Sequence, residues 1–235
     1  MPFSLLPLIR PLIDVVFPPV CLACGRLRVP EELFLCTDCY RSLPRTTHAD
    51  ALYRATEAKL AAGGLIDRLF SPFTFDQGSP LQSLVHELKY GGASGIGLML
   101  GKEIARCMIG EIDPVKVFGV IPVPLHRTKQ RERGYNQSVL LCRGIRGVLG
   151  IPSLERVLVR TRYTETQTAL DAAARAANVR GAFALGLDAP AGLSGATVIL
   201  VDDVVTTGTT LRECAAVLRG AGAGVLFGAT VAVAP

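Results

Sequence analysis

Two adjacent acids and a hydroxyl-rich loop are the residues of this sequence best suited to chemistry. Asp202 and Asp203 follow the apolar run 198–201, and the next loop contains Thr206, Thr207, Gly208, Thr209 and Thr210. Paired carboxylates can accept hydrogen bonds from the vicinal hydroxyls of a ribose, while backbone N–H groups and hydroxyls can surround one phosphate. The order of these groups predicts a ribose 5-phosphate site, in which Gly208 lets the backbone approach the phosphate oxygens.

Two other structures share parts of this pattern. An apolar strand that ends in two acids also occurs in P-loop nucleotide hydrolases, but the sequence contains no G-x-x-x-x-G-K-[ST] motif. The second is an ordinary strand followed by a capped helix, with both acids solvated. The sequence alone leaves this second interpretation open.

The densest positive charge of the chain follows another apolar run, 117–123, which ends at two prolines. Its basic members are His126, Arg127, Lys129, Arg131 and Arg133. Such side chains can hold a diphosphate through charge-assisted hydrogen bonds, and Arg131 and Arg133 are the candidates for a catalytic role. The same charges also suit a solvated surface loop or contact with a nucleic-acid backbone.

Two C-x-x-C pairs lie near the start of the chain. They are Cys21 with Cys24, and Cys36 with Cys39. Four thiolates at this separation can close a tetrahedron around one Zn²⁺. Redox chemistry would need one pair only, and disulfides do not suit the reducing compartment expected below. We therefore expect a small zinc ribbon whose fold depends on structural zinc.

The acids, the threonine loop and the basic residues must be positioned by strands and helices. Short apolar runs, typical of strands, alternate along the chain with segments of helical periodicity. The runs lie at 117–123, 157–159, 198–201 and 225–233, and helices are expected near 81–91, 96–107, 135–149 and 172–177. This alternation predicts an α/β fold in which helices cover both faces of a parallel sheet. The site is then expected at the carboxyl ends of the strands. A further amphipathic helix is expected at 5–16, against the rest of the chain or a partner.

Composition limits the class of protein. The 235 residues are 49% hydrophobic with a formal charge of +5, which allows a sizeable core and permits an anionic partner without requiring one. The apolar stretch 5–20 is interrupted by prolines and charges and is too short to span a bilayer. It also lacks the features of a secretory signal. We expect a cytoplasmic protein without a transmembrane segment.

The stretch 198–210 resembles the phosphoribosyl-diphosphate (PRPP) motif of type I phosphoribosyltransferases, and the whole chain resembles the ComF family. The second resemblance rests on residues 122–137, which run from Pro-Val-Pro-Leu-His to Arg-Gly-Tyr-Asn-Gln, and on a later group. That group is Arg160, Arg162, Thr164, Gln167, Leu170, Arg175, Asn178 and Phe183. Residues 1–62 are then the N-terminal helix and zinc ribbon, and residues 63–235 a phosphoribosyltransferase-like domain, with the boundary at Gly63-Gly64.

The resemblance implies binding of PRPP with Mg²⁺ bridging its diphosphate, and a mobile basic loop that closes over the substrate. It also implies a role in DNA uptake during natural competence, beside a helicase-like partner at the inner face of the membrane. Three functions stay open: a phosphoribosyltransferase, a DNA-uptake factor that binds single strands through the ribbon and the basic loop, and a PRPP or nucleotide sensor without turnover. The sequence offers no obvious general base.

Overall fold

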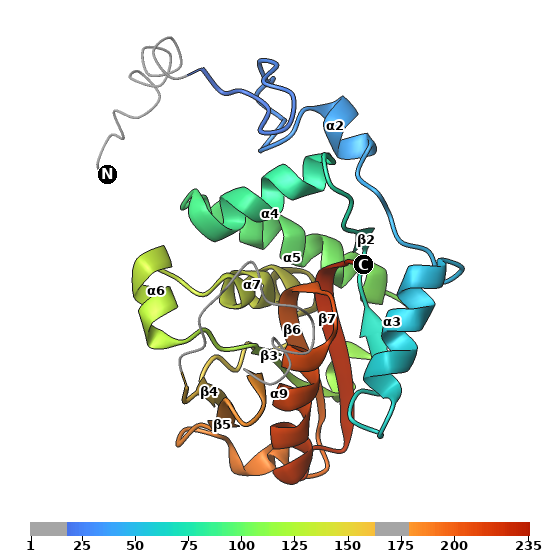
Figure 1. The fold of residues 1–235 in the computed structure, drawn as a ribbon, viewed down its shortest axis with the longest axis vertical. Helices are drawn as coiled ribbons and strands as arrows, with labels where there is room; N and C mark the ends of the chain where they lie inside the picture. The colour runs from blue at the N-terminus through green and yellow to red at the C-terminus, as the bar shows by residue number, and fades with distance from the viewer. Residues whose placement is uncertain (1–17, 163–178) are drawn as a thin grey trace.

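A parallel sheet lies at the centre of the computed structural model, which describes residues 18–162 and 179–235 (Figure 1). Its strands follow the order β1-β7-β6-β3, and β2 also pairs with β7. The bounds are Arg68–Phe70 for β1, Phe73–Thr74 for β2, Val117–Pro122 for β3, Thr197–Val205 for β6 and Val225–Val233 for β7. All of these pairings are parallel, so the fold is the predicted α/β class.

The central strand β6 is buried on both faces. Ile199 and Val201 belong to one hydrophobic cluster, whereas Val198 and Leu200 belong to a second cluster. Successive side chains of a strand point to opposite faces, so each cluster lies on its own side of the sheet. This explains why the run 198–201 is apolar at every position rather than at every second one.

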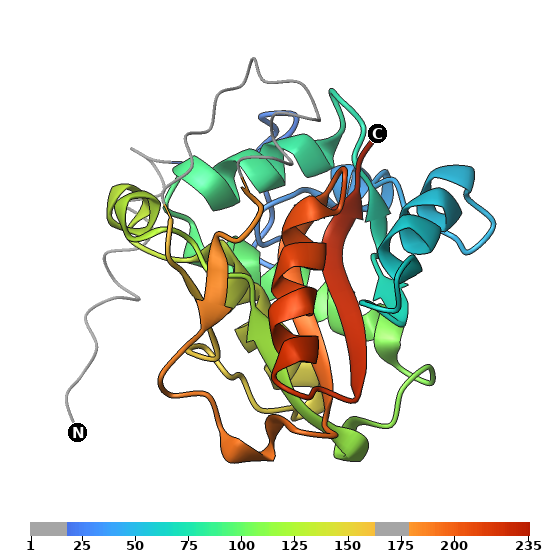
Figure 2. The same ribbon diagram turned by 60° about the horizontal axis from the view of Figure 1, so that its bottom comes forward.

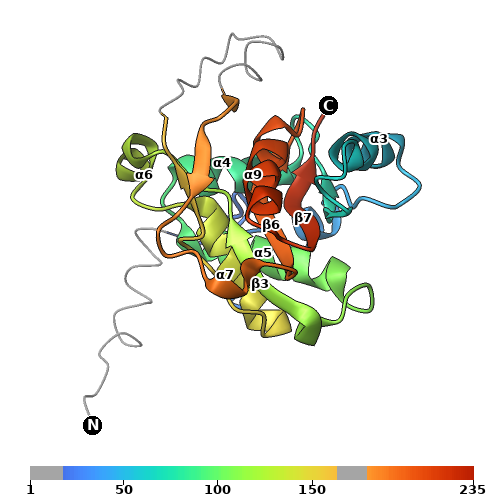
Figure 3. The same cartoon turned by 90° about the horizontal axis from the view of Figure 1, so that it is seen from below.

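Helices form a layer on each face of the sheet. Seen from below, α9 lies on one side and α5 and α7 lie on the other (Figure 3), and α9 runs along the front of β6 and β7 in a tilted view (Figure 2). The bounds are Thr37–Arg41 for α2, Ala51–Ala61 for α3, Pro80–Tyr90 for α4, Ser94–Met108 for α5, Arg127–Arg133 for α6, Gln137–Leu149 for α7 and Thr209–Gly220 for α9. Short 3₁₀ turns occur at Pro114–Lys116 and Ala191–Leu193.

The helices α5 and α7 touch through their backbones. A Cβ atom added at Gly101 would lie 2.2 Å from the carbonyl oxygen of Leu141, and one at Gly144 would lie 2.4 Å from that of Leu98. Only glycine allows so close an approach of the two helix backbones. The predicted helices at 81–91, 96–107 and 135–149 are thus confirmed as α4, α5 and α7.

The predicted parallel strand at 157–159 is wrong in its pairing. This segment forms β4, Leu158–Arg160, which pairs antiparallel with β5, Phe183–Leu185, in a separate two-stranded sheet. The outer edge of β3 is covered instead by residues 152–154, where Val120 donates its N–H to the Pro152 carbonyl at 2.8 Å. An apolar run indicates burial but does not identify the neighbour it pairs with.

The predicted basic loop is a helix, α6. His126 caps its start by accepting the Thr128 N–H at Nδ1, over 3.3 Å, and Gly134 ends it with a φ of 79°. Arginine, lysine, glutamine and glutamate favour helix, and glycine readily takes the left-handed conformation that terminates one.

The part of the chain that precedes α4 contributes residues to both hydrophobic clusters, one on each face of the sheet. Cys21, Leu35, Cys36 and Leu43 belong to the cluster that also contains residues of α4, α5 and α7. Tyr53 and Leu60 of α3 belong to the other cluster. The domain boundary at Gly63-Gly64 stays a prediction. The helices expected at 5–16 and 172–177 lie outside the described residues.

Candidate functional site

Four cysteines converge at the edge of the molecule that carries α2. The Sγ atoms of Cys21, Cys24, Cys36 and Cys39 all lie within 4.8 Å of one another. Cys21 and Cys36 are buried, whereas Cys24 is exposed. Four thiol donors at this mutual distance suit tetrahedral coordination, so the predicted cysteines form a site of the structural-zinc type.

The backbone around these cysteines is bent to bring the thiols together. Gly25 takes a φ of 73° directly after Cys24 and donates its N–H to the Cys21 carbonyl at 2.9 Å. Burial acts against ionisation of Cys21, but backbone N–H groups of Cys36, Cys24 and Ala23 outweigh it and lower the pKa of this thiol to about 6. The peptide groups therefore favour the thiolate form of Cys21, whereas burial and the neighbouring thiols raise the pKa of Cys39.

The hydroxyl-rich loop leaves the carboxyl end of β6 and wraps around a small hollow of about 40 Å³. The loop residues Thr206, Thr207, Gly208, Thr209 and Thr210 all line it, together with Asp202. Gly208 has a φ of 74° and directly precedes α9 as its N-cap, and the hydroxyls of Thr207 and Thr209 are 3.0 Å apart. The hollow thus lies among hydroxyls at a helix start, a combination that suits a phosphate.

The acidic pair lies inside β6, which continues to Val205 rather than ending at the acids. Asp203 is buried, with Oδ2 3.0 Å from Nζ of Lys89 at the end of α4 and 3.3 Å from Nε2 of Gln137. Asp202 accepts from Ser138 Oγ at 3.4 Å and from the N–H of Asp203 at 2.9 Å. The start of α7 and the end of α4 therefore hold the two carboxylates.

The two carboxylates have an unequal charge balance. Burial and the neighbouring Asp203 raise the pKa of Asp202 to about 7. Burial opposes the charge of Lys89, but the nearby Asp203 and Asp202 raise the pKa of this lysine above its ordinary value. Lys89 is therefore charged beside Asp203, and Asp202 is partly protonated near pH 7. The unliganded pair of acids thus carries a reduced negative charge.

The structure brings only some of the predicted basic residues towards this pair. Lys129 and Arg133 line a hollow of about 260 Å³ together with Lys89. Arg127 and Arg131 are exposed on α6, and His126 caps that helix. Of the two candidates for catalysis, Arg133 thus faces the hollow that Lys89 shares, and Arg131 is a surface residue.

Sequence reasoning missed the residues that hold the acids. The sequence indicates only a helix end at Lys89, and it does not distinguish Gln137 and Ser138 as separate candidates. Asn136 caps α7 by accepting the Ser138 N–H at 3.0 Å, and its Nδ2 donates to the Val123 carbonyl at 3.0 Å. The Tyr-Asn-Gln-Ser run after the basic segment is the available signal, since an asparagine before an apolar periodic segment marks a helix start and so places Gln137 and Ser138 in its first turn.

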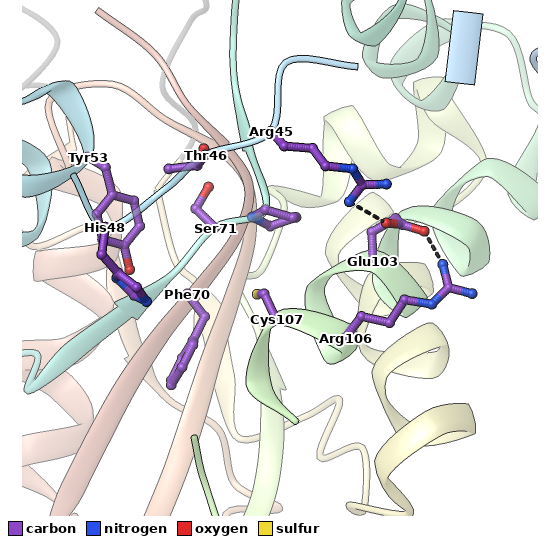
Figure 4. A pocket seen from close by; sticks show the side chains of 10 residues that line it. Arg45, Thr46, His48, Tyr53, Phe70, Ser71, Glu103, Arg106 and Cys107 are labelled. Carbon is purple, nitrogen blue, oxygen red and sulfur yellow. Dashed lines mark hydrogen bonds and ion pairs between the residues drawn. The ribbon is translucent and has the colours of Figure 1, made fainter. Parts of the chain in front are cut away.

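A separate hollow of about 250 Å³ lies between α5 and the segment that follows the ribbon (Figure 4). At its side, Glu103 is buried, and its carboxylate lies 3.2 Å from Arg45 and accepts from Tyr40 OH at 2.6 Å. Arg106 pairs with the same carboxylate. This cluster connects the ribbon to α5 and contains none of the predicted site residues.

Models of two protein families match the chain. A double zinc ribbon domain matches residues 12–49, and a phosphoribosyl transferase domain matches residues 130–234. The first match contains all four clustered cysteines, and the second contains the acidic pair and the loop of threonines. None of the helices within residues 18–162 and 179–235 is long and apolar enough to cross a membrane.

Relatives resemble the chain over different lengths. The DNA utilization protein YhgH of Salmonella typhimurium is 33% identical over 216 residues, which cover 87% of this chain and 86% of that protein. Competence protein F of Haemophilus influenzae is 42% identical over 103 residues, but these span only 44% of either chain. Among solved structures, the glutamine PRPP amidotransferase of B. subtilis is 23% identical with a TM-score of 0.37, covering 62% of this chain and 30% of that one.

Proposed function

Because this chain belongs to the ComF family, which includes the DNA utilization protein YhgH, we propose that it binds PRPP or a related ribose phosphate. The observation that carries this proposal is the hollow at the carboxyl end of β6, where the threonine loop and Asp202 share one space. In the proposed complex the loop holds the 5′-phosphate, and the two acids accept hydrogen bonds from the ribose hydroxyls.

We propose a transfer of ribose 5-phosphate as the chemistry of this site. The bond between C1 of the ribose and the diphosphate oxygen breaks, and its electron pair leaves with the diphosphate. A nitrogen lone pair of the acceptor forms the new bond to C1, and the proton on that nitrogen passes to water. Lys89, whose ammonium group lies beside the acids, would stabilise the leaving diphosphate.

Mg²⁺ is part of this proposal because the acids supply the oxygen ligands that it prefers. When bound, it would neutralise charge on the diphosphate. Asp202 and Asp203 are the residues of this chain that would face the metal–ribose assembly. The reduced charge of the unliganded pair then gives way to two ionised carboxylates, so we expect tighter ribose phosphate binding above about pH 7 than below it.

Calorimetric titration with ribose 5-phosphate, and with PRPP and Mg²⁺, tests the proposal. Thr207→Val removes one loop hydroxyl without changing the size of the side chain, and should weaken binding of both ligands about tenfold, the equivalent of one hydrogen bond. Thr197→Val, at the opposite end of β6, is the matched control and should bind like the wild type. Absence of binding by the wild-type protein would overturn the proposal.

Turnover is a separate measurement on the same protein. Release of diphosphate from PRPP in the presence of nitrogenous acceptors would establish a transferase. Binding of PRPP without diphosphate release for any acceptor would favour a PRPP or nucleotide sensor instead. The two functions share the site and differ only in this outcome.

DNA handling is a second candidate function, which we propose from the exposed Arg127 and Arg131 on α6. A phosphate backbone that contacts these side chains would occupy the surface next to the ribose site, in a cytoplasmic protein that works with a helicase-like partner at the membrane. Affinity for single-stranded DNA should then fall steeply with salt and fall again in Arg127→Ala/Arg131→Ala. A flat salt response would count against this function.

A further inference from the structure

The hollow between the end of α4 and α6 has a composition that the ribose phosphate site does not explain. Its lining consists of Lys89, Tyr90, Gly92, Lys129, Glu132 and Arg133, and it measures about 260 Å³ against about 40 Å³ for the hollow in the threonine loop. Lys89 belongs to both places, because its ammonium group lies 3.0 Å from Asp203. The larger hollow therefore adjoins the acidic pair that we assign to the ribose.

A flat aromatic surface forms one part of this hollow. Tyr90 is 68% exposed although it is a large aromatic residue at the end of a helix. The Arg133 guanidinium carbon lies 5.3 Å from the centre of the Tyr90 ring, and Gln137 fixes that guanidinium through a hydrogen bond of 2.8 Å. Aromatic rings and guanidinium planes are surfaces on which planar rings stack.

The hollow also has an excess of positive charge. Asp203 neutralises Lys89, which leaves Glu132 as the acid of the lining to balance Lys129 and Arg133. Burial, with the nearby charges of Arg160 and Arg133, lowers the pKa of Lys129. A cation held among other cations favours the entry of an anion, whose charge would relieve their repulsion.

We propose that this hollow binds the acceptor of the transfer reaction, and that the acceptor is a planar ring that carries an anionic group. The proposal rests on the proposed function and names its substrate class. A diphosphate alone would satisfy the cations but would leave the Tyr90 ring 68% exposed, with Arg133 over the ring and His86 tilted at 49° to it as its neighbours. A neutral ring would satisfy Tyr90 but would leave Lys129 and Arg133 facing Glu132 alone within the hollow. A ring with a carboxylate satisfies both.

Two matched pairs of probes test the anionic requirement. Orotate differs from uracil by a carboxylate, and nicotinate differs from nicotinamide by a carboxylate in place of an amide. Each is titrated calorimetrically into the wild-type protein, with and without saturating ribose 5-phosphate. We expect at least one anionic probe to bind about tenfold or more tightly than its neutral partner, since one charge-assisted hydrogen bond is worth this factor.

Variants of the hollow test its location. Tyr90→Ala and Lys129→Ala should each weaken the anionic probe about tenfold, while ribose 5-phosphate affinity changes less than about twofold. Tyr90→Phe keeps the ring and should bind like the wild type. Lys116→Ala is the matched lysine control, because the Lys116 side chain is 80% exposed at the far end of β3.

The outcomes separate this inference from the function on which it rests. If ribose 5-phosphate binds but neither anionic probe is preferred over its neutral partner, the acceptor assignment is wrong and the proposed function stands. If ribose 5-phosphate fails to bind, the proposed function is wrong, while an anionic probe that still requires Tyr90 would keep the hollow as a binding site. If the variants weaken PRPP but not ribose 5-phosphate or the anionic probes, the hollow holds the diphosphate. Binding of oligodeoxythymidylate through Tyr90, with no binding of the small anions, would likewise overturn the acceptor assignment.

Discussion

The two neighbouring acids of β6 differ in environment although they are the same residue type. Asp203 is buried with Lys89 and Gln137, while Asp202 has Ser138 and the N–H of Asp203 as its donors. Because Asp203 has the lysine, the cost of a second negative charge falls on Asp202. The chemistry of the pair therefore depends on which carboxylate the nearest cation contacts.

This asymmetry predicts a pH dependence of stability. An unfolded aspartate titrates near pH 4, but Asp202 in the fold has a pKa of about 7. Between these values the folded protein holds a proton that the unfolded chain has released, so the free energy of unfolding should fall as the pH rises through this window. We expect a loss of roughly 1–3 kcal/mol from about pH 5 to about pH 8 in the unliganded protein.

Asp202→Asn should remove most of that loss, because asparagine does not titrate. Urea unfolding at a series of pH values measures the slope. Asp188→Asn is the control, because Asp188 is exposed and pairs with Arg156 at 3.5 Å on the surface. An unchanged slope in Asp202→Asn would show that another group causes the pH dependence.

The loop glycine gives a prediction about backbone shape. Gly208 has a φ of 74°, and a Cβ atom there would lie 2.7 Å from Cδ2 of Leu60. Gly208→Ala should therefore destabilise the protein by about 1–2 kcal/mol and distort the phosphate loop. Thermal unfolding and ribose 5-phosphate titration measure the two effects.

Gly220, the last residue of α9, provides the control for this substitution. At Gly220 nothing lies within 4 Å of an added Cβ, and the backbone is not in the left-handed region. Gly220→Ala should be neutral or slightly stabilising, because alanine is the better helix former. Equal losses in both variants would mean that the conformation of Gly208 is not special.

At the scale of elements, the sequence predicts which segments are helices and strands better than it predicts their partners. The periodicity of 81–91 and 135–149 identifies α4 and α7, because an amphipathic face must be buried wherever the helix lies. The apolar residues of 157–159 indicate burial and so predict a strand of the parallel sheet, yet the edge of β3 is filled by residues 152–154. The sequence of a segment does not show which of two distant segments will pair with the edge of a strand.

In the candidate site, too, the sequence predicts which neighbouring residues act together better than it predicts contacts between distant elements. The threonine loop and the four cysteines lie close in sequence, so their spacing alone predicts that each group comes together. Lys89 reaches Asp203 from more than a hundred positions away, and only the fold brings them within 3.0 Å. Sequence reasoning therefore identified the groups that act within one loop, and missed those supplied by another element.

The contact between the ribbon and α5 gives the prediction at this scale. The Glu103 side chain is 2% exposed, and Arg45 and Arg106 both reach its carboxylate (Figure 4). The Tyr40 hydroxyl donates to the same carboxylate. Glu103→Gln keeps the shape but removes the charge that both arginines approach, so we expect a loss of about 1–3 kcal/mol in unfolding free energy. Urea denaturation measures it.

An exposed pair serves as the control for the buried one. Arg143 and Glu155 lie 3.1 Å apart, with side chains that are 54% and 38% exposed. Glu155→Gln should change stability by less than about 0.5 kcal/mol, because surface ion pairs contribute little. If the two glutamine variants lose the same stability, Glu103 does not act as the connection that its burial indicates.

At the scale of the whole molecule, the ribbon is part of the core rather than an appended unit. Cys21 and Cys36 share a hydrophobic cluster with Leu88 of α4 and Leu100 of α5. A ribbon of this size has few apolar residues of its own, so its fold should depend on the metal that the four thiols bind. Loss of the metal should therefore uncover the apolar surface of α4 and α5 as well as unfold the ribbon.

Chelation of zinc should accordingly act in two places. We expect new protease cleavage within residues 18–45 and a lower urea midpoint for the remaining sheet, because about 25 cal/mol is lost for each Å² of apolar surface that returns to water. Limited proteolysis with mass spectrometry and urea unfolding follow the two effects, and Cys24→Ser should reproduce both without a chelator. Cys107→Ser is the control, because this half-buried thiol lies outside the cluster of four and should leave the metal-loaded protein protected. A cleavage pattern that chelation leaves unchanged would mean that the ribbon folds without metal, whereas new cleavage with an unchanged urea midpoint would mean that the ribbon folds and unfolds independently of α4 and α5.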